Sequence, residues 1–115
     1  MARKIYKILS GADWAAARSA GVYAGSPLDL ADGYIHLSAG DQVAQTLALH
    51  FAGRDDLVLA AFDADALGAA LRWEPSRGGA LFPHLYAALP VRDATDFAPL
   101  ARDADGAHVL PDFVR

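Results

Sequence analysis

The segment Tyr34–Ser38 carries side chains that could hydrogen-bond a polar ligand. Period-two alternation places Tyr34, His36 and Ser38 on one face of a predicted strand, with two apolar residues on the other face. The apolar pair can anchor the strand in a core, so the imidazole and the hydroxyls point elsewhere. A buried histidine needs a partner, so we expect His36 to contact either a ligand or a backbone carbonyl. The pattern indicates a site but identifies no reaction.

A second segment repeats the pattern, because His84 and Tyr86 share a strand face behind Phe82. If this strand lies beside Tyr34–Ser38, two imidazoles, a phenol and a hydroxyl surround one pocket. Such a set suits a sugar or a nucleoside. The alternative is that these side chains only cover a sheet face.

Three further polar residues are candidates. Glu74 is predicted to act as a general base or to accept from a ribose hydroxyl, and Arg77, in a glycine-rich turn, to contact an anion. Alternatively these two form a surface ion pair worth under ~1 kcal/mol. Gln42 lies near the start of a predicted helix, where backbone amides favour anions, and either assists a ligand beside Ser38 or is solvent-exposed. Ser38 also matches a capping box with Asp41, so we predict that it caps this helix.

Composition excludes several classes of site. The chain has no cysteine, which removes disulfides, thiolate metal sites and thiol catalysis. Its histidines are widely spaced, and we expect no metal. The formal charge is −4 and the basic residues are scattered, so we expect no nucleic-acid partner. No apolar run approaches the ~20 residues that span a bilayer, so we expect no membrane partner and a soluble, cytoplasmic protein.

The candidate residues must be positioned by the strands and helices of the chain. The order of these predicted elements indicates one α+β domain over residues 1–115, with mixed or antiparallel sheets and short helices. Strands are predicted at Ile5–Leu9, Tyr34–Ser38, Leu57–Phe62, Leu71–Glu74 and Leu81–Ala88, and near His108–Leu110. Helices are predicted at Ala12–Ala20, Asp41–Ala52 and, in shorter form, Ala64–Leu71 and Asp96–Ala101, with one helical turn capped by Ser26. Because Pro83 cannot donate to a ladder, its strand is expected to begin at or after it, or to lie at an edge.

Several of these motifs together resemble one family. They are the segments Tyr23–Asp29, Asp32–Ser38, Gln42, Trp73–Glu74 and Phe82–Tyr86. The chain resembles the small bacterial family called domain of unknown function 952, from Ile5 to about Pro90. The blocks Gly-Tyr-Ile-His-Leu-Ser and Phe-Pro-His-Leu-Tyr are its most specific parts.

The resemblance implies an ADP-ribosylation-like fold, in which proteins similar to ADP-ribosyltransferases bind NAD in a cleft between two small sheets. Many of them carry His-Gly-Ser or His-Gly-Thr on an early strand, where the histidine holds the nicotinamide ribose. The segment His36-Leu37-Ser38 matches the outer positions and departs at the middle one, where glycine lets the backbone approach nicotinamide. A tyrosine and a catalytic glutamate complete the usual set, and Tyr86 and Glu74 are of the right types.

The resemblance therefore implies binding or processing of NAD, as substrate, or of an ADP-ribose-like nucleotide, around His36 and His84. In a transferase-like enzyme, His36 and Glu74 would be catalytic, and the other candidates would bind the ligand. The alternative is a binding or protein-interaction module with a degenerate site. The sequence leaves open whether catalysis occurs and which oligomeric state the chain adopts.

Overall fold

The computed structural model describes residues 3–114, apart from the side chain of Arg77. Within that range the strands are β1 (Lys4–Ser10), β2 (Ile35–His36), β3 (Ser38–Ala39), β4 (Leu57–Asp63), β5 (Leu71–Pro75), β6 (Leu81–Leu85) and β7 (Asp96–Pro99). The α-helices are α1 (Gly11–Ala20), α2 (Pro27–Asp32), α3 (Val43–His50) and α4 (Ala64–Leu67). Short 3₁₀ turns occupy Gly68–Ala70, Arg77–Gly79 and Val91–Asp93. No helix in residues 3–114 is long and apolar enough to cross a bilayer.

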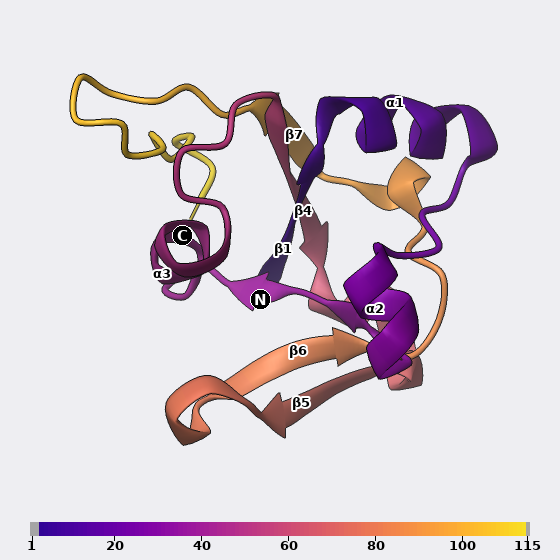
Figure 1. The fold of residues 1–115 in the computed structure, drawn as a ribbon. Helices are drawn as coiled ribbons and strands as arrows, with labels where there is room; N and C mark the ends of the chain where they lie inside the picture. Colours follow the sequence, from indigo (N-terminus) through magenta and orange to yellow (C-terminus); the bar gives the residue numbers. More distant parts are fainter. Residues whose placement is uncertain (1–2, 115) are drawn as a thin grey trace.

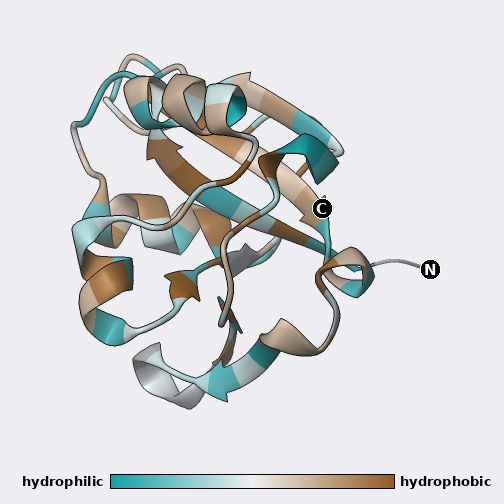
Figure 2. Cartoon of the chain, turned by 90° about the vertical axis from the view of Figure 1, so that its right-hand side faces the viewer, coloured by the Kyte–Doolittle hydropathy of each residue, from teal (hydrophilic) through white to brown (hydrophobic). Residues whose placement is uncertain are grey.

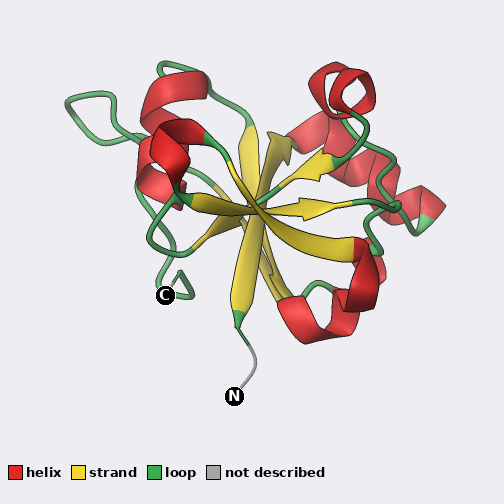
Figure 3. Ribbon diagram, turned by 90° about the horizontal axis from the view of Figure 1, so that it is seen from below, coloured by secondary structure: helices red, strands yellow, loops and turns green. Residues whose placement is uncertain are grey.

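The described strands form two sheets, and every pairing between them is antiparallel. One sheet has the order β3-β1-β4-β7 and the other the order β2-β6-β5. The sheets face one another, and their strands cross when the molecule is seen from below (Figures 1 and 3). The α+β class with antiparallel sheets and short helices is therefore confirmed.

The apolar core lies on both sides of β4. Val58, Ala60 and Phe62 belong to the cluster that faces the second sheet, whereas the alternate residues of β4 pack toward α3 and the end of the chain. Figure 2 shows the matching pattern, with apolar segments concentrated on the strands and helices of mixed character. The segment Leu57–Phe62, a continuous apolar run that was predicted as a strand, thus forms a strand buried on both faces.

The segment Tyr34–Ser38 is not one strand. Ile35 and His36 pair with β6, whereas Ser38 pairs with β1 in the other sheet. Between them, the Leu37 N–H donates to the Pro83 carbonyl at 3.1 Å. The predicted strand therefore divides at Leu37, where the chain passes from one sheet to the other.

Pro83 lies inside the central strand of its sheet, so the prediction that it marks a strand start or an edge is wrong. A strand residue directs its N and its C=O to the same side. The Pro83 carbonyl accepts from the Leu37 N–H, so the Pro83 nitrogen also faces β2. It does not face Trp73, the cross-strand partner of Pro83 on β5. Because β2 ends at His36, the missing N–H falls beyond the end of that ladder.

The predicted helix at Asp96–Ala101 is also wrong, because this segment forms the edge strand β7 against β4. The predicted last strand is reduced to one bridge between Arg102 and His108. Pairing with the long apolar β4 overrides the weak local helix signal.

Candidate functional site

His36 and His84 are direct cross-strand partners, so the predicted convergence of the two faces is confirmed. Their ring centroids lie 5.7 Å apart. The Tyr34 ring stacks on His84, with 4.1 Å between centroids, and also contacts the Tyr86 ring at 5.3 Å. Four of the predicted site residues therefore form one aromatic cluster.

His84 is held by a carboxylate on one side only. Its side chain is buried, and its Nδ1 lies 2.8 Å from Glu74 Oε1. Because a carboxylate only accepts, Nδ1 carries the donated proton, and in the neutral ring Nε2 then has the free lone pair. This Nε2 has no hydrogen-bond partner among residues 3–114. His84 thus combines a fixed ring with one available nitrogen.

Glu74 accepts a second hydrogen bond, from the Tyr86 hydroxyl at 2.7 Å. Hydrogen bonds from Tyr86 and His84 hold the pKa of the Glu74 carboxyl below its usual range. The same bond raises the pKa of the Tyr86 hydroxyl, because Tyr86 must stay protonated to donate it. Glu74 is therefore a carboxylate at neutral pH and a fixed acceptor for His84.

His36 differs from His84 because both of its ring nitrogens are engaged. Its Nδ1 lies 2.6 Å from Asp29 Oδ1, and its Nε2 lies 2.9 Å from Asp32 Oδ2. Since carboxylates only accept, both contacts are hydrogen bonds when each ring nitrogen carries a proton. In this arrangement His36 offers no free ring nitrogen to a ligand.

A buried ion pair lies beneath His36. The Lys7 ammonium is 3.0 Å from Asp29 Oδ2 and also donates to the His36 carbonyl at 2.9 Å. Both side chains of the pair are buried, with 8% exposure for Lys7 and 2% for Asp29. Burial lowers the pKa of the Lys7 ammonium, although Asp29 acts in the opposite direction. For Asp29 burial would raise the pKa, but Lys7 and hydrogen bonds from His36 and Ser26 hold it below its usual value.

Local sequence places Asp29 at this point. Ser26 caps α2, as predicted, and Asp29 completes a reciprocal capping box by accepting from the Ser26 N–H at 2.9 Å. Gly25 lies close by with φ +120°, and a Cβ there would lie 2.9 Å from the Asp29 Cβ. The glycine therefore lets the preceding loop pass against the buried carboxyl.

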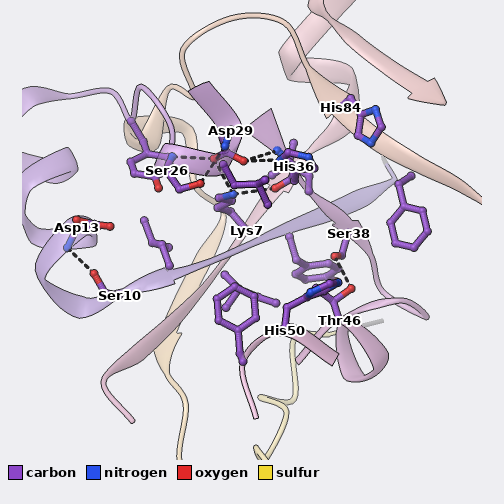
Figure 4. A pocket seen from close by; sticks show the side chains of 18 of the residues that line it. Lys7, Ser10, Asp13, Ser26, Asp29, His36, Ser38, Thr46, His50 and His84 are labelled. Atoms are coloured by element: carbon purple, nitrogen blue, oxygen red, sulfur yellow. Dashed lines mark hydrogen bonds and ion pairs between the residues drawn. The ribbon is translucent and has the colours of Figure 1, made fainter. Parts of the chain in front are cut away.

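A cavity of about 660 Å³ adjoins the two histidines. It follows β1, whose partner β3 pairs only with Ile5 and Tyr6 and leaves the edge from Lys7 to Ser10 uncovered. Figure 4 shows His36, Asp29 and His84 on one side of this cavity, with Ser10 and His50 at other parts of its wall. The volume lies within the ~300–1,000 Å³ of small-molecule pockets.

Six of the eight predicted site residues divide into two groups. His36, Ser38 and His84 line the cavity, whereas Tyr34, Glu74 and Tyr86 belong to the cluster around His84 and not to the cavity wall. The Gln42 side chain joins two strands, accepting from Ala39 N and donating to the Leu81 carbonyl at 2.8 Å. The side chain of Arg77 lies outside the described part of the structure.

Ser38 does not cap a helix, so that prediction is wrong. The helix α3 begins at Val43, after Gln42, and the Ser38 hydroxyl lies 3.3 Å from Thr46 Oγ1. The Gln42 side chain instead accepts from Ala39 N, which displaces the predicted capping box. Among residues 3–114, no three His, Asp or Glu side chains gather closely enough to hold a metal ion.

Sequence reasoning missed Lys7 and Asp29. Lys7 occupies the same face of β1 as the core residues Ile5 and Leu9, so it points between the sheets. A lysine is rarely buried without a partner, so its residue type favours solvent over the core face to which alternation assigns it. The signal available for Asp29 was its place in the capping box after Ser26, which fixes a carboxyl near the following strand.

We expect Asp29 to make the fold sensitive to acid. In the folded protein the pKa of the Asp29 carboxyl lies below its ordinary value of 3.8. Between these two pKa values, the unfolded chain therefore binds a proton that the folded chain does not. Stability is therefore complete above the ordinary value and is lost as pH falls through the folded pKa. Urea unfolding between pH 7 and pH 3 should show a flatter dependence for Asp29→Asn than for the wild type. Equal slopes for both proteins would contradict this assignment.

The family model described as protein of unknown function (DUF952) matches residues 8–97. The crystal structure of protein CC0527 from Caulobacter crescentus is 54% identical, covers 96% of this chain and 97% of its own, and superimposes with a TM-score of 0.91. The solution NMR structure of CC0527 covers 90% of each chain with 56% identity and a TM-score of 0.82. No curated protein matches the chain. On the family match and these structural relatives, the chain belongs to the DUF952 family.

Proposed function

We propose that the cavity binds a ribose-bearing nucleotide of the NAD or ADP-ribose class, on an ADP-ribosylation-like fold. The observation that carries this proposal is His84, a buried imidazole that lines the cavity with Nδ1 fixed on Glu74 and Nε2 available. Nε2 can accept from a ribose hydroxyl in this tautomer. Glu74 and Tyr34 hold the ring, so little side-chain entropy is lost on binding.

The cavity wall supports a ligand with both polar and flat apolar parts. Tyr23, Phe51 and Phe82 supply apolar and aromatic surface, and the uncovered edge of β1 supplies backbone donors and acceptors. The position of the cavity, next to the point where the chain passes between two sheets, agrees with the cleft that the sequence resemblance implies.

Leu37 argues for binding rather than transfer. Its N–H is already donated to Pro83, so this amide is not available to a nicotinamide group. We therefore propose that the ADP-ribose part supplies most of the affinity. NAD and ADP-ribose are expected to bind with similar affinity, and nicotinamide alone is not expected to bind.

The test is a thermal and urea unfolding series with NAD, ADP-ribose, adenosine and nicotinamide. A ligand present at 100 times its Kd stabilises a fold by about 2.7 kcal/mol. ADP-ribose and NAD should raise the melting temperature in proportion to the logarithm of their concentration. No stabilisation by either compound would refute the proposed function. Chromatography of the NAD samples separates binding from turnover, because release of nicotinamide would show an enzyme.

A further inference from the structure

The cavity has a second end, away from His84. His50, Phe51 and Arg54 line it from the end of α3 and the loop that follows, and Ser10 and Asp13 line it from the end of β1 and the start of α1. The loop lies beside this end of β1, because Gly11 N donates to the Asp56 carbonyl at 2.8 Å. The second end therefore contains its own set of polar side chains.

Arg54 differs from the other fixed cation of the wall. The Lys7 ammonium is paired with Asp29, whereas the exposed Arg54 guanidinium has no carboxylate partner within residues 3–114. It lies over the Phe51 ring, 5.3 Å from the centroid. An aromatic ring beneath a guanidinium holds its plane while the N–H groups stay free to donate.

The backbone of Arg54 is held in place from a distant segment. Its carbonyl accepts from His108 Nε2 at 2.7 Å. The neighbouring Asp55 accepts from Arg102 through both oxygens, at 2.8 and 3.1 Å. The loop thus presents the guanidinium at a fixed point of the cavity rim, which reduces the ordering cost of binding.

The separation of the two ends limits the ligand. Lys7 reaches the carbonyl of His36 at one end, and Ser10 lies at the other. Three residues of extended strand span roughly 10 Å. A nucleoside held at His84 has no anionic group for Arg54 to contact, whereas the diphosphate of a nucleotide adds both length and negative charge.

We propose that Arg54, assisted by His50, binds phosphoryl groups, so that the ligand is a diphosphate-bearing nucleotide rather than a nucleoside. This inference rests on the proposed function for the ligand's other end. Arg54 donates from a planar fork that matches phosphate oxygens, and His50 adds a donor at the end of α3. Asp13, also on this wall, opposes the bound anion.

The test compares Kd values by titration calorimetry for ADP-ribose, adenosine and inorganic pyrophosphate. Arg54→Gln should weaken ADP-ribose about 10-fold, which is the loss of one charge-assisted hydrogen bond, and leave adenosine unchanged. Asp13→Asn should tighten ADP-ribose, because it removes the opposing charge. The matched control is Arg18→Gln. Arg18 is exposed and stacked 4.7 Å from the Phe97 centroid, but it is outside the cavity wall, so its variant should bind as the wild type does.

The outcomes separate this inference from the proposed function. An equal effect of Arg54→Gln on ADP-ribose and adenosine, or no effect on either, overturns the phosphate assignment and leaves nucleotide binding intact. Pyrophosphate binding that depends on Arg54, without binding of ADP-ribose, supports the phosphate site and refutes the proposed ligand. Failure of all three compounds to bind the wild type overturns both.

Discussion

Replacing Asp29 with alanine is expected to lower the free energy of unfolding by about 3–5 kcal/mol. Asp29 accepts four hydrogen bonds, from the Lys7 ammonium, from both the backbone and the ring of His36, and from the Ser26 N–H. Removing Asp29 leaves the Lys7 ammonium buried without a counter-ion, and an unpaired buried charge is strongly destabilising. Urea unfolding at pH 7 measures the loss.

Asp32→Ala is the matched control, because it removes the carboxylate on the other nitrogen of the same His36 ring. The Asp32 carboxyl is 42% exposed, so this variant should lose no more than about 1 kcal/mol. In the double variant Lys7→Met/Asp29→Leu both charges are gone, and we expect it to recover at least about 1 kcal/mol of the Asp29→Ala loss. Equal losses for Asp29→Ala and Asp32→Ala would show that the pair does not anchor α2 and β2.

The elements that could be predicted are those whose local pattern agrees with their packing. The helix α1 begins with Ser10 accepting from Asp13 N and ends at Gly21 with φ 89°, as capping rules require. The apolar strand β4 is buried on both faces. In these cases short-range chemistry and the tertiary fold favour the same structure.

The parts that could not be predicted depend on partners far away in the sequence. The division of Tyr34–Ser38 at Leu37 follows from two sheets competing for one segment, which alternation cannot reveal. β7 forms because β4 has a free edge, not because Asp96–Pro99 prefers a strand. A resemblance could transfer residue types such as Glu74 and Tyr86, but it could not show that Glu74 accepts from both Tyr86 and His84.

Within the site, too, the sequence could not show which distant partners each residue contacts. From the sequence, His36 and His84 are equivalent, since each sits beside a tyrosine on a strand face. The structure separates them by their hydrogen bonds: His36 has carboxylates on both nitrogens, and His84 has one on Nδ1 alone. The residue most suited to a ligand contact is therefore the second histidine, and the first is suited to positioning α2 against the sheet.

This difference gives a direct comparison of two identical substitutions. In His84→Asn the amide nitrogen lies as many bonds from Cβ as Nδ1 does, so the hydrogen bond to Glu74 can be kept while Nε2 is lost. ADP-ribose should bind about 10 to 100 times more weakly, which corresponds to one lost hydrogen bond to a buried group. Loss of the stacked Tyr34 contact should cost only about 0.5–1.5 kcal/mol of stability.

His36→Asn is the control on the neighbouring strand. It removes a ring whose nitrogens contact Asp29 and Asp32, so it should reduce stability while changing the ADP-ribose Kd less than His84→Asn does. Calorimetric titration gives the affinity, and urea unfolding gives the stability of each variant. If His36→Asn instead abolishes binding while His84→Asn binds like the wild type, then the ligand displaces Asp29 or Asp32 from the His36 ring. The roles of the two histidines would then be the reverse of those that their hydrogen bonds indicate.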